Sequence, residues 1–254
     1  MEVHHHAHTA PAHGGTGRKK WTHYFWEFLM LFLAVFCGFL AEYQLEHKIE
    51  KKKANQYIHS FYKDLKTDTT TFGRIINSGE IKLAAFSDIF KCYDTIRKNW
   101  RSTSCLIPLV KNSRSNITVT FSDGTLQQLK TAGGYRMLNT EDRDSIIGYD
   151  NSKQDYKNYE STIFQQTQDI VRSTFSMIGD FESNKFISPS IAGADSSHTE
   201  MPLLFSENKD LLNKYFNDLF RYKTVINGQI REIKGRKEKA ERLVAYFKKK
   251  YSLE

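Results

Sequence analysis

The run FLMLFLAVFCGFLA, from Phe28 to Ala41, contains no polar residue and limits the possible folds of this chain more than any other feature. With Tyr24-Phe25-Trp26 upstream it extends to about 18 residues, in which Glu27 is the only charge. A helix of that length spans about 27 Å, close to the thickness of the bilayer hydrocarbon, and Glu27 near one end can lie among the headgroups. Aromatic residues typical of a membrane interface flank the run, namely Trp21, Tyr24, Trp26 and Tyr43. The sequence therefore predicts a transmembrane helix over 21–43.

Two other interpretations of this run compete with a membrane anchor. A helix of a water-exposed bundle needs a polar face, which the run does not offer, so it would have to be buried all round. A cleaved signal peptide needs small residues before the cleavage site, but no Ala-x-Ala pattern follows the run. Phe36 before Cys37 also argues against a lipoprotein signal. We therefore expect an uncleaved signal-anchor.

Basic residues lie on both sides of the run, so the positive-inside rule discriminates weakly between the two orientations. Three precede it (Arg18, Lys19 and Lys20) and four follow it (Lys48, Lys51, Lys52 and Lys53). Those on the amino side lie closer to the apolar residues. We expect a bacterial inner-membrane protein with a cytoplasmic N-terminus and a periplasmic domain over 44–254.

The rest of the chain has a helical pattern. Only 14 Gly and 4 Pro occur in 254 residues, too few for a many-turned β architecture. Apolar residues recur three, four or seven positions apart and predict an all-α fold in which the anchor continues into an antiparallel helical bundle. The expected segments are a disordered His-rich head 1–20, a stalk helix 44–101, an irregular segment with a short helix 102–138, a helix 139–186, a loop 187–206 and a helix 207–251.

Several local features refine these segments. Alternation over Ile117–Phe121 is the only strand-like stretch, and Asp123 is expected to cap the short helix that Gly133-Gly134 ends. Asn139 or Thr140 is expected to begin the next helix, and Ser206 with Glu207 the last one. The core-facing stripe expected on the 139–186 helix is Ile146, Tyr149, Tyr156, Ile163, Ile170, Phe175, Ile178 and Phe181.

Motifs that carry chemistry are missing from the sequence. There is no phosphate-binding GxxxxGK[ST] or GxGxxG loop, no GxSxG nucleophile elbow and no HExxH zinc helix. The only candidate metal ligands, weak because no carboxylate or cysteine accompanies them, are His4, His5, His6 and His8. We expect neither an enzyme nor a cofactor. Cys92 and Cys105 lie 13 residues apart and are candidates for a disulfide if the domain is periplasmic.

The C-terminal segment from Arg221 carries most of the net charge of +8, with eleven Lys or Arg against four Glu. One interpretation is a basic face that binds anionic lipid or an acidic partner, with candidate residues Arg236, Lys237, Arg242, Lys248, Lys249 and Lys250. The other is a solvated helix face with ordinary i,i+4 ion pairs such as Glu232 with Arg236. No binding of nucleic acid is expected.

The order of an apolar anchor, Ala41-Glu42, a basic run and Asp64-Leu65 with Asp68 resembles the amino-terminal part of a family of single-pass bacterial membrane proteins of unknown function. A second stretch is similar to the pattern of a Leu-Lys-x-x-Gly turn followed by a helix in that family, and it comprises Thr125 to Gly133, Met137 to Asn139, Asp142-Arg143 and Ile146 to Tyr149. The resemblance covers roughly residues 25 to 150. It implies an inner-membrane anchor and a helical extracytoplasmic domain, and no activity or cofactor.

Two functional hypotheses follow. The first is a membrane-anchored accessory or scaffold protein that binds another envelope protein complex, with membrane lipid and a protein partner or further copies of the chain as partners. The second is a sensory input module whose bundle binds a small ligand and signals through a membrane partner.

Overall fold

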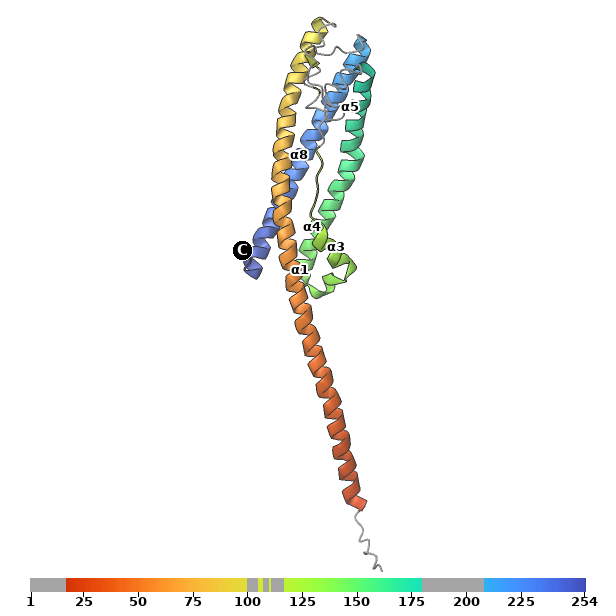
Figure 1. Ribbon diagram of the computed structural model, residues 1–254, viewed down its shortest axis with the longest axis vertical. Coiled ribbons are helices and arrows are strands. Elements are labelled where there is room, and N and C mark those ends of the chain that lie inside the picture. Colours follow the sequence, from red (N-terminus) through yellow and green to blue (C-terminus); the bar gives the residue numbers. More distant parts are fainter. Residues whose placement is uncertain (1–16, 100–104, 107–109, 111–116, 180–207) are drawn as a thin grey trace, which may run out of the picture. The chain divides into compact units, whose positions relative to one another are not determined.

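The computed structural model describes residues 17–99, 105–106, 110, 117–179 and 208–254, and every regular element in these ranges is a helix. The all-α prediction is therefore confirmed. Figure 1 labels the α-helices of these ranges. In chain order the elements are α1 (Gly17–Lys98), α3 (Gly124–Thr131), the 3₁₀ helix η1 (Gly134–Met137), α4 (Thr140–Tyr159), the π-helical turn η2 (Glu160–Phe164), α5 (Gln165–Ile178) and α8 (Lys209–Tyr251).

The chain divides into two compact units, residues 1–53 and 54–254. The first contains the amino-terminal part of α1, where the apolar side chains from Phe25 to Leu40 are exposed, except for the partly buried Leu29. A window of this helix has a mean hydropathy of 2.0 and none of it is buried, so one helix of the described chain is long and apolar enough to cross a membrane. The four predicted interface residues are also exposed, Trp21 (83%), Tyr24 (65%), Trp26 (62%) and Tyr43 (53%).

The core of the second unit consists of two clusters of buried apolar side chains. Aromatic contacts show how α1 and α8 meet. Phe61 contacts Phe247 with ring centroids 5.8 Å apart, and Tyr93 contacts Phe216 at 4.6 Å. Residue numbers therefore fall along α8 as they rise along α1.

Helix α8 also contacts the continuous helix formed by α4, η2 and α5, which we call the α4–α5 helix. Here too, residue numbers fall along one helix as they rise along the other. Lys239 Nζ donates to the carbonyl of Gly148 near one end, and Phe175 contacts Tyr215 near the other. Gly79 of α1 is buried against Ile230, and a Cβ added there would lie 2.7 Å from Ile230 Cγ1. The helices of this unit approach closely, as the apolar periodicity requires.

Residues 117–123 form neither a helix nor a strand. The predicted alternation is present, because Ile117, Val119 and Phe121 are buried while Thr118 and Thr120 are exposed. Helix side chains, rather than a second strand, bind its backbone.

Three such hydrogen bonds fix this irregular segment. Gln229 Nε2 donates to the Ile117 carbonyl at 3.1 Å, while the Val119 and Ser122 amides donate to Glu160 Oε1 at 3.2 Å and Asp68 Oδ1 at 2.7 Å. The predicted strand is wrong here, because buried polar side chains, rather than a neighbouring strand, form the hydrogen bonds that the backbone needs.

The helix ends differ from the predicted bounds in two places. The predicted 139–186 helix ends at Ile178, where Gly179 adopts an extended conformation with ψ 135°. The last helix is capped by Asn208, whose side chain accepts hydrogen bonds from the Asp210 and Leu211 amides. Ser206 and Phe181, like the loop 187–206, lie outside the described residues.

Of the caps predicted for α3 and α4, one is confirmed and one is wrong. Asn139 caps α4 as predicted, since its Oδ1 accepts from the Asp142 amide at 2.9 Å. Asp123 does not cap α3 through its side chain, because its carboxylate binds Lys153 and Lys157 instead. Gly133 follows α3 with φ 62°, a left-handed conformation that favours glycine.

Candidate functional site

A change in the buried face of the α4–α5 helix occurs at its π-helical turn. Before the turn, Asp142, Tyr149 and Tyr156 recur every seven residues and are at most 1% exposed. After the turn, the same seven-residue series turns outward and leaves three apolar side chains exposed, Ile163 (46%), Ile170 (36%) and Met177 (52%). The residues one position later are at most 2% exposed, Phe164, Val171 and Ile178.

The geometry of the turn explains this shift. A π-helical turn closes i→i+5 hydrogen bonds and so inserts one extra residue into an α-helix. The core-facing series after η2 (Glu160–Phe164) is accordingly displaced by one residue. The prediction that Ile163 and Ile170 belong to the core is therefore wrong. A second apolar series at Phe164, Val171 and Ile178 was the available signal in the sequence.

Buried polar groups hold the start of this turn. Glu160 is 8% exposed, and its Oε1 accepts the hydrogen bond from the Val119 amide. Burial raises the pKa of Glu160, although the hydrogen bonds from Val119 and Tyr156 act in the opposite direction. Tyr156 accepts a hydrogen bond from Gln229 Nε2 at 2.8 Å, so α8 is linked to the same turn.

The exposed face after the turn carries little charge. Of the 19 residues from 161 to 179, only Asp169 and Arg172 are charged, whereas 18 of the 43 residues of α8 are charged. Arg172 Nη1 and Asp169 Oδ1 lie 3.3 Å apart, and the other exposed polar side chains are Ser, Thr or Gln. We call the face formed by Ile163, Gln166, Ile170, Ser173 and Met177 the α5 surface.

A cavity of about 250 Å³ lies beside the α5 surface. Its lining is polar except for one aromatic ring, and comprises Thr118, Glu160, Phe164, Gln165, Gln168, Asp169 and Arg172. Carboxylate, amide and guanidinium groups thus face one space, which suits a small molecule carrying both hydrogen-bond donors and acceptors.

A buried lysine, Lys82, lies near Arg172 of the cavity lining. It is 3% exposed, and its Nζ donates to the Tyr222 hydroxyl at 2.9 Å. Burial, with a smaller contribution from Arg172, lowers the pKa of Lys82 to about 7. Sequence reasoning missed this residue, because nothing in its spacing distinguishes it from a surface lysine.

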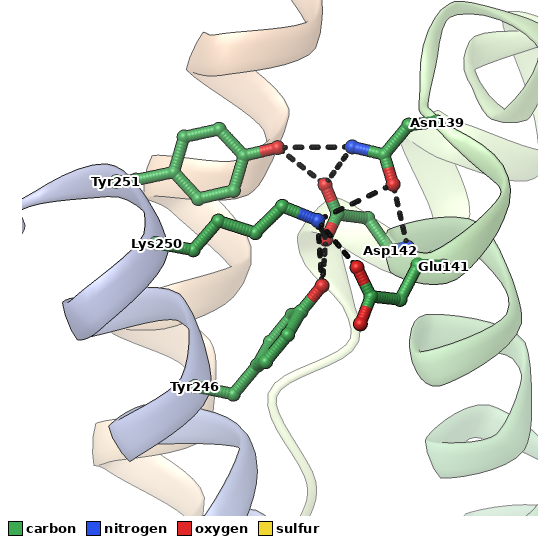
Figure 2. A network of polar contacts seen from close by, with 6 residues as sticks. All are labelled: Asn139, Glu141, Asp142, Tyr246, Lys250 and Tyr251. Carbon is green, nitrogen blue, oxygen red and sulfur yellow. Dashed lines mark hydrogen bonds and ion pairs between the residues drawn. The ribbon is translucent and has the colours of Figure 1, made fainter.

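A polar network ties the end of α8 to the start of α4 (Figure 2). The Asp142 carboxylate accepts hydrogen bonds from Lys250 Nζ at 2.8 Å, Tyr246 Oη at 2.7 Å, Asn139 Nδ2 at 2.5 Å and also from the Tyr251 hydroxyl. Glu141 binds Lys250 at 3.0 Å. Burial would raise the pKa of Asp142, but the hydrogen bonds, that from Lys250 foremost, outweigh burial and lower it. We call this set the C-terminal network.

The predicted basic residues of α8 divide into two groups. Arg236 binds Glu232 and the carbonyl of Ser152, Lys237 binds Glu241, and Lys250 belongs to the C-terminal network. Their charges are matched within the fold. Arg242, Lys248 and Lys249 are exposed at the surface.

The other predicted site residues are placed as follows. Cys92 and Cys105 are joined by a disulfide with Cα atoms 6.0 Å apart, and Cys37 is exposed in the apolar helix. The candidate ligands His4, His5, His6 and His8 lie outside the described residues. Within the described ranges, no three His, Cys, Asp or Glu side chains gather in a way that could hold a metal ion.

Comparison of the chain with protein-family models, with curated proteins and with solved structures finds no match.

Proposed function

We propose that this chain is a non-enzymatic, membrane-anchored accessory or scaffold protein that binds another envelope protein through the α5 surface. In this proposal the apolar helix is an uncleaved signal-anchor in a bacterial inner membrane, with the amino end in the cytoplasm. Residues 54–254 form an antiparallel helical bundle in the periplasm.

Three observations support the anchor and the bundle. None of the apolar side chains between Phe25 and Leu40 is buried, as expected for residues that face lipid. The inverse order of contacts along α8 supports an antiparallel bundle. The Cys92–Cys105 disulfide supports an oxidising compartment such as the periplasm. The resemblance of residues 25 to 150 to single-pass bacterial membrane proteins agrees with this proposal.

The observation that carries the binding function is the outward turn of Ile163, Ile170 and Met177. Single exposed apolar side chains are common, but three that recur every seven residues on a face with little charge are typical of a helix that packs against another protein. The π-helical turn produces this face without exposing the core, because Phe164, Val171 and Ile178 replace it inside.

Photo-crosslinking in intact cells tests the proposal. A photoreactive amino acid at Gln166 in the full chain is expected to give a defined protein adduct, which Ile170→Asp abolishes. Ile81→Asp is the matched control, because Ile81 is an apolar side chain of α1 that is 65% exposed. An unchanged adduct in Ile170→Asp, or loss of the adduct in both variants, would contradict binding through the α5 surface.

A sensory module that binds a small ligand is the second candidate function, and the cavity beside η2 favours it. Under this alternative a polar metabolite fills the cavity and changes the π-helical turn. Its test is a ligand-dependent rise in the melting temperature of the purified full chain that Arg172→Ala and Gln165→Ala reduce. A screen of polar metabolites that produces no such rise would contradict it.

A further inference from the structure

We propose that the cavity beside η2 binds a short peptide of the size of a dipeptide, with its ammonium group at Glu160 and its carboxylate at Arg172. This inference goes beyond the protein-binding role of the α5 surface. It rests on the second candidate function, in which a small ligand fills the cavity, and it names the class of that ligand.

The lining of the cavity has a carboxyl group at one end and basic groups at the other. Glu160 begins η2 and Arg172 lies in α5, so their backbones are on the order of 15 Å apart along the helix. Arg172 Nη1 lies 3.3 Å from Asp169 Oδ1, so the guanidinium extends back towards Glu160 and shortens this gap. An extended dipeptide spans up to about 7 Å, whereas the two charged groups of a single amino acid are attached to the same carbon atom. A ligand with separated charges therefore suits the lining.

Glu160 provides the negative end. It is 8% exposed, and its carboxylate accepts hydrogen bonds from the Val119 amide and the Tyr156 hydroxyl. Burial nevertheless raises the pKa of Glu160, because these two bonds do not replace the water that the ionised carboxylate loses. A carboxylate has about four acceptor sites, so the ammonium group of a ligand can bind there and compensate its charge.

Two basic side chains lie at the other end. Arg172 lines the cavity, and a guanidinium can bind a ligand carboxylate through two parallel N–H groups beside Asp169. Lys82 is linked to this end through Tyr222, whose hydroxyl accepts a hydrogen bond from Lys82 Nζ and also bonds Gln168 of the lining. The charge of Arg172 helps to lower the pKa of Lys82, so the two basic groups disfavour each other. A carboxylate bound beside them relieves this repulsion.

Amide and hydroxyl groups line the rest of the cavity. Gln165, Gln168 and Thr118 offer both donors and acceptors, with which a peptide bond can form hydrogen bonds but an alkyl chain cannot. The ring of Phe164 provides an apolar contact for a small side chain. The volume of about 250 Å³ lies below the roughly 300–1,000 Å³ of pockets for drug-sized ligands, so we expect a dipeptide rather than a longer peptide.

Titration calorimetry of the purified full chain in detergent tests the ligand class, with L-alanyl-L-alanine as the probe. Two analogues of nearly the same shape each remove one charge, since L-lactoyl-L-alanine lacks the ammonium group and L-alanyl-L-alanine amide lacks the carboxylate. Both are expected to bind at least about tenfold more weakly, because a hydrogen bond between charged groups is lost at one end. Failure of alanylalanine to bind at millimolar concentration, or equal affinities for all three compounds, would overturn the proposal.

A third analogue tests the role of the peptide bond. The compound δ-aminovalerate keeps both charges at the spacing of a dipeptide but has an alkyl chain between them. It is expected to bind several-fold more weakly than alanylalanine, because the amide groups of the lining then lose their partner. Binding of δ-aminovalerate at least as tight as that of alanylalanine would overturn a peptide as the ligand.

Substitutions at the two ends test where each charge binds. Arg172→Gln is expected to weaken the binding of alanylalanine at least about tenfold but to leave the affinity for its amide nearly unchanged, since the amide has no carboxylate to lose. Glu160→Gln is expected to weaken alanylalanine but not the lactoyl analogue. Arg143→Gln is the matched control, because Arg143 is also 38% exposed and also lies beside an aspartate, Asp144. Equal effects of Arg172→Gln and Arg143→Gln, or equal losses for alanylalanine and its amide, would overturn the proposed orientation.

These measurements separate the inference from both candidate functions. A Gln166 adduct in cells without any binding of alanylalanine would support protein binding through the α5 surface and overturn this inference. A different polar metabolite that raises the melting temperature through Arg172 would support the sensory module and overturn a dipeptide as its ligand. Binding of alanylalanine without a Gln166 adduct would support this inference and contradict binding through the α5 surface.

Discussion

Asp142 shows how single residues hold this fold together. Its carboxylate is buried, and an ion in that position is tolerated only when hydrogen bonds and an opposite charge compensate for the loss of water. Lys250, Tyr246, Tyr251 and Asn139 supply them, the most distant of them, Tyr251, from 109 residues away in the sequence (Figure 2). Acidic residues in the first turn of α4 were predictable, but the partners from α8 were not, because such pairing depends on tertiary structure.

We predict that Asp142→Asn destabilises the protein by about 2–3 kcal/mol at neutral pH. Because the pKa of Asp142 is lower in the folded than in the unfolded chain, its contribution is present above the unfolded pKa of about 4. That contribution disappears as the pH falls through the folded pKa. Urea unfolding of wild type and Asp142→Asn at pH 7 and at pH 3 measures this, and the difference is expected to shrink at pH 3. Glu141→Gln, at a side chain that is 70% exposed, is the control. A difference that grows towards low pH would contradict the assignment.

Tyr149 makes a second buried bond of this kind. Its hydroxyl donates to Asp68 Oδ2 at 2.7 Å, and burial raises the pKa of Asp68 although this bond and the Ser122 amide act to lower it. We predict that Tyr149→Phe lowers the free energy of unfolding by about 2 kcal/mol, since a buried carboxyl loses a donor. Tyr135→Phe is the control, because in the described part of the chain the Tyr135 hydroxyl is buried and has no hydrogen-bond partner. Equal effects in urea unfolding would show that the Asp68 bond does not matter.

At the scale of the element, the π-helical turn is the feature that sequence reasoning missed. Periodicity predicted the long helices and identified Ile146, Tyr149 and Tyr156 as core residues. It failed for Ile163 and Ile170, because a regular 3.6-residue period was assumed through Glu160–Phe164. The resulting shift by one residue exchanged the core and surface positions of the helix.

Deletion of one residue distinguishes this turn from the regular helix beside it. We predict that deleting Thr162 converts η2 to α-helix and leaves the buried series on both sides in place, at a cost of at most about 1–2 kcal/mol. Deleting Ser173 from α5 rotates the residues that follow it by about 100°, exposing Phe175 and Ile178, and is expected to abolish cooperative unfolding. Thermal unfolding followed by circular dichroism compares the two. The reverse ranking would contradict the π-helical turn.

Helix contacts make a second prediction at this scale. Gly79→Ala is expected to destabilise the chain by about 1–3 kcal/mol, since the new methyl group lies 2.7 Å from Ile230 Cγ1. Gly73→Ala, in the same helix with no atom within 4 Å of its Cβ, is expected to stabilise it by about 0.5–1 kcal/mol. Shifts of the same sign in chemical denaturation would argue against close contact at Gly79.

For the whole molecule, the sequence pattern identifies the candidate membrane helix but not the contacts that connect the elements of the second unit. The apolar run and its aromatic flanks predicted the candidate membrane helix, which is fully exposed in the first unit. In the second unit, the strand-like alternation of Ile117–Phe121 predicts which side chains are buried, but it does not predict that residues 117–123 link Asp68, Glu160 and Gln229. Each of those bonds joins residues at least 41 positions apart, which no local pattern encodes.

The outward-facing series Ile163, Ile170 and Met177 is the basis of the proposed function, and cysteine labelling tests it most directly. In a Cys37→Ser background of the full chain in detergent, single cysteines at positions 163, 164, 170 and 171 are treated with a polar maleimide under native conditions. The shift of the buried face at η2 predicts rapid labelling of Ile163→Cys and Ile170→Cys, and protection of Phe164→Cys and Val171→Cys until the chain unfolds. Protection at 163 and 170 with rapid labelling at 164 and 171 would show an uninterrupted α-helix and contradict the account.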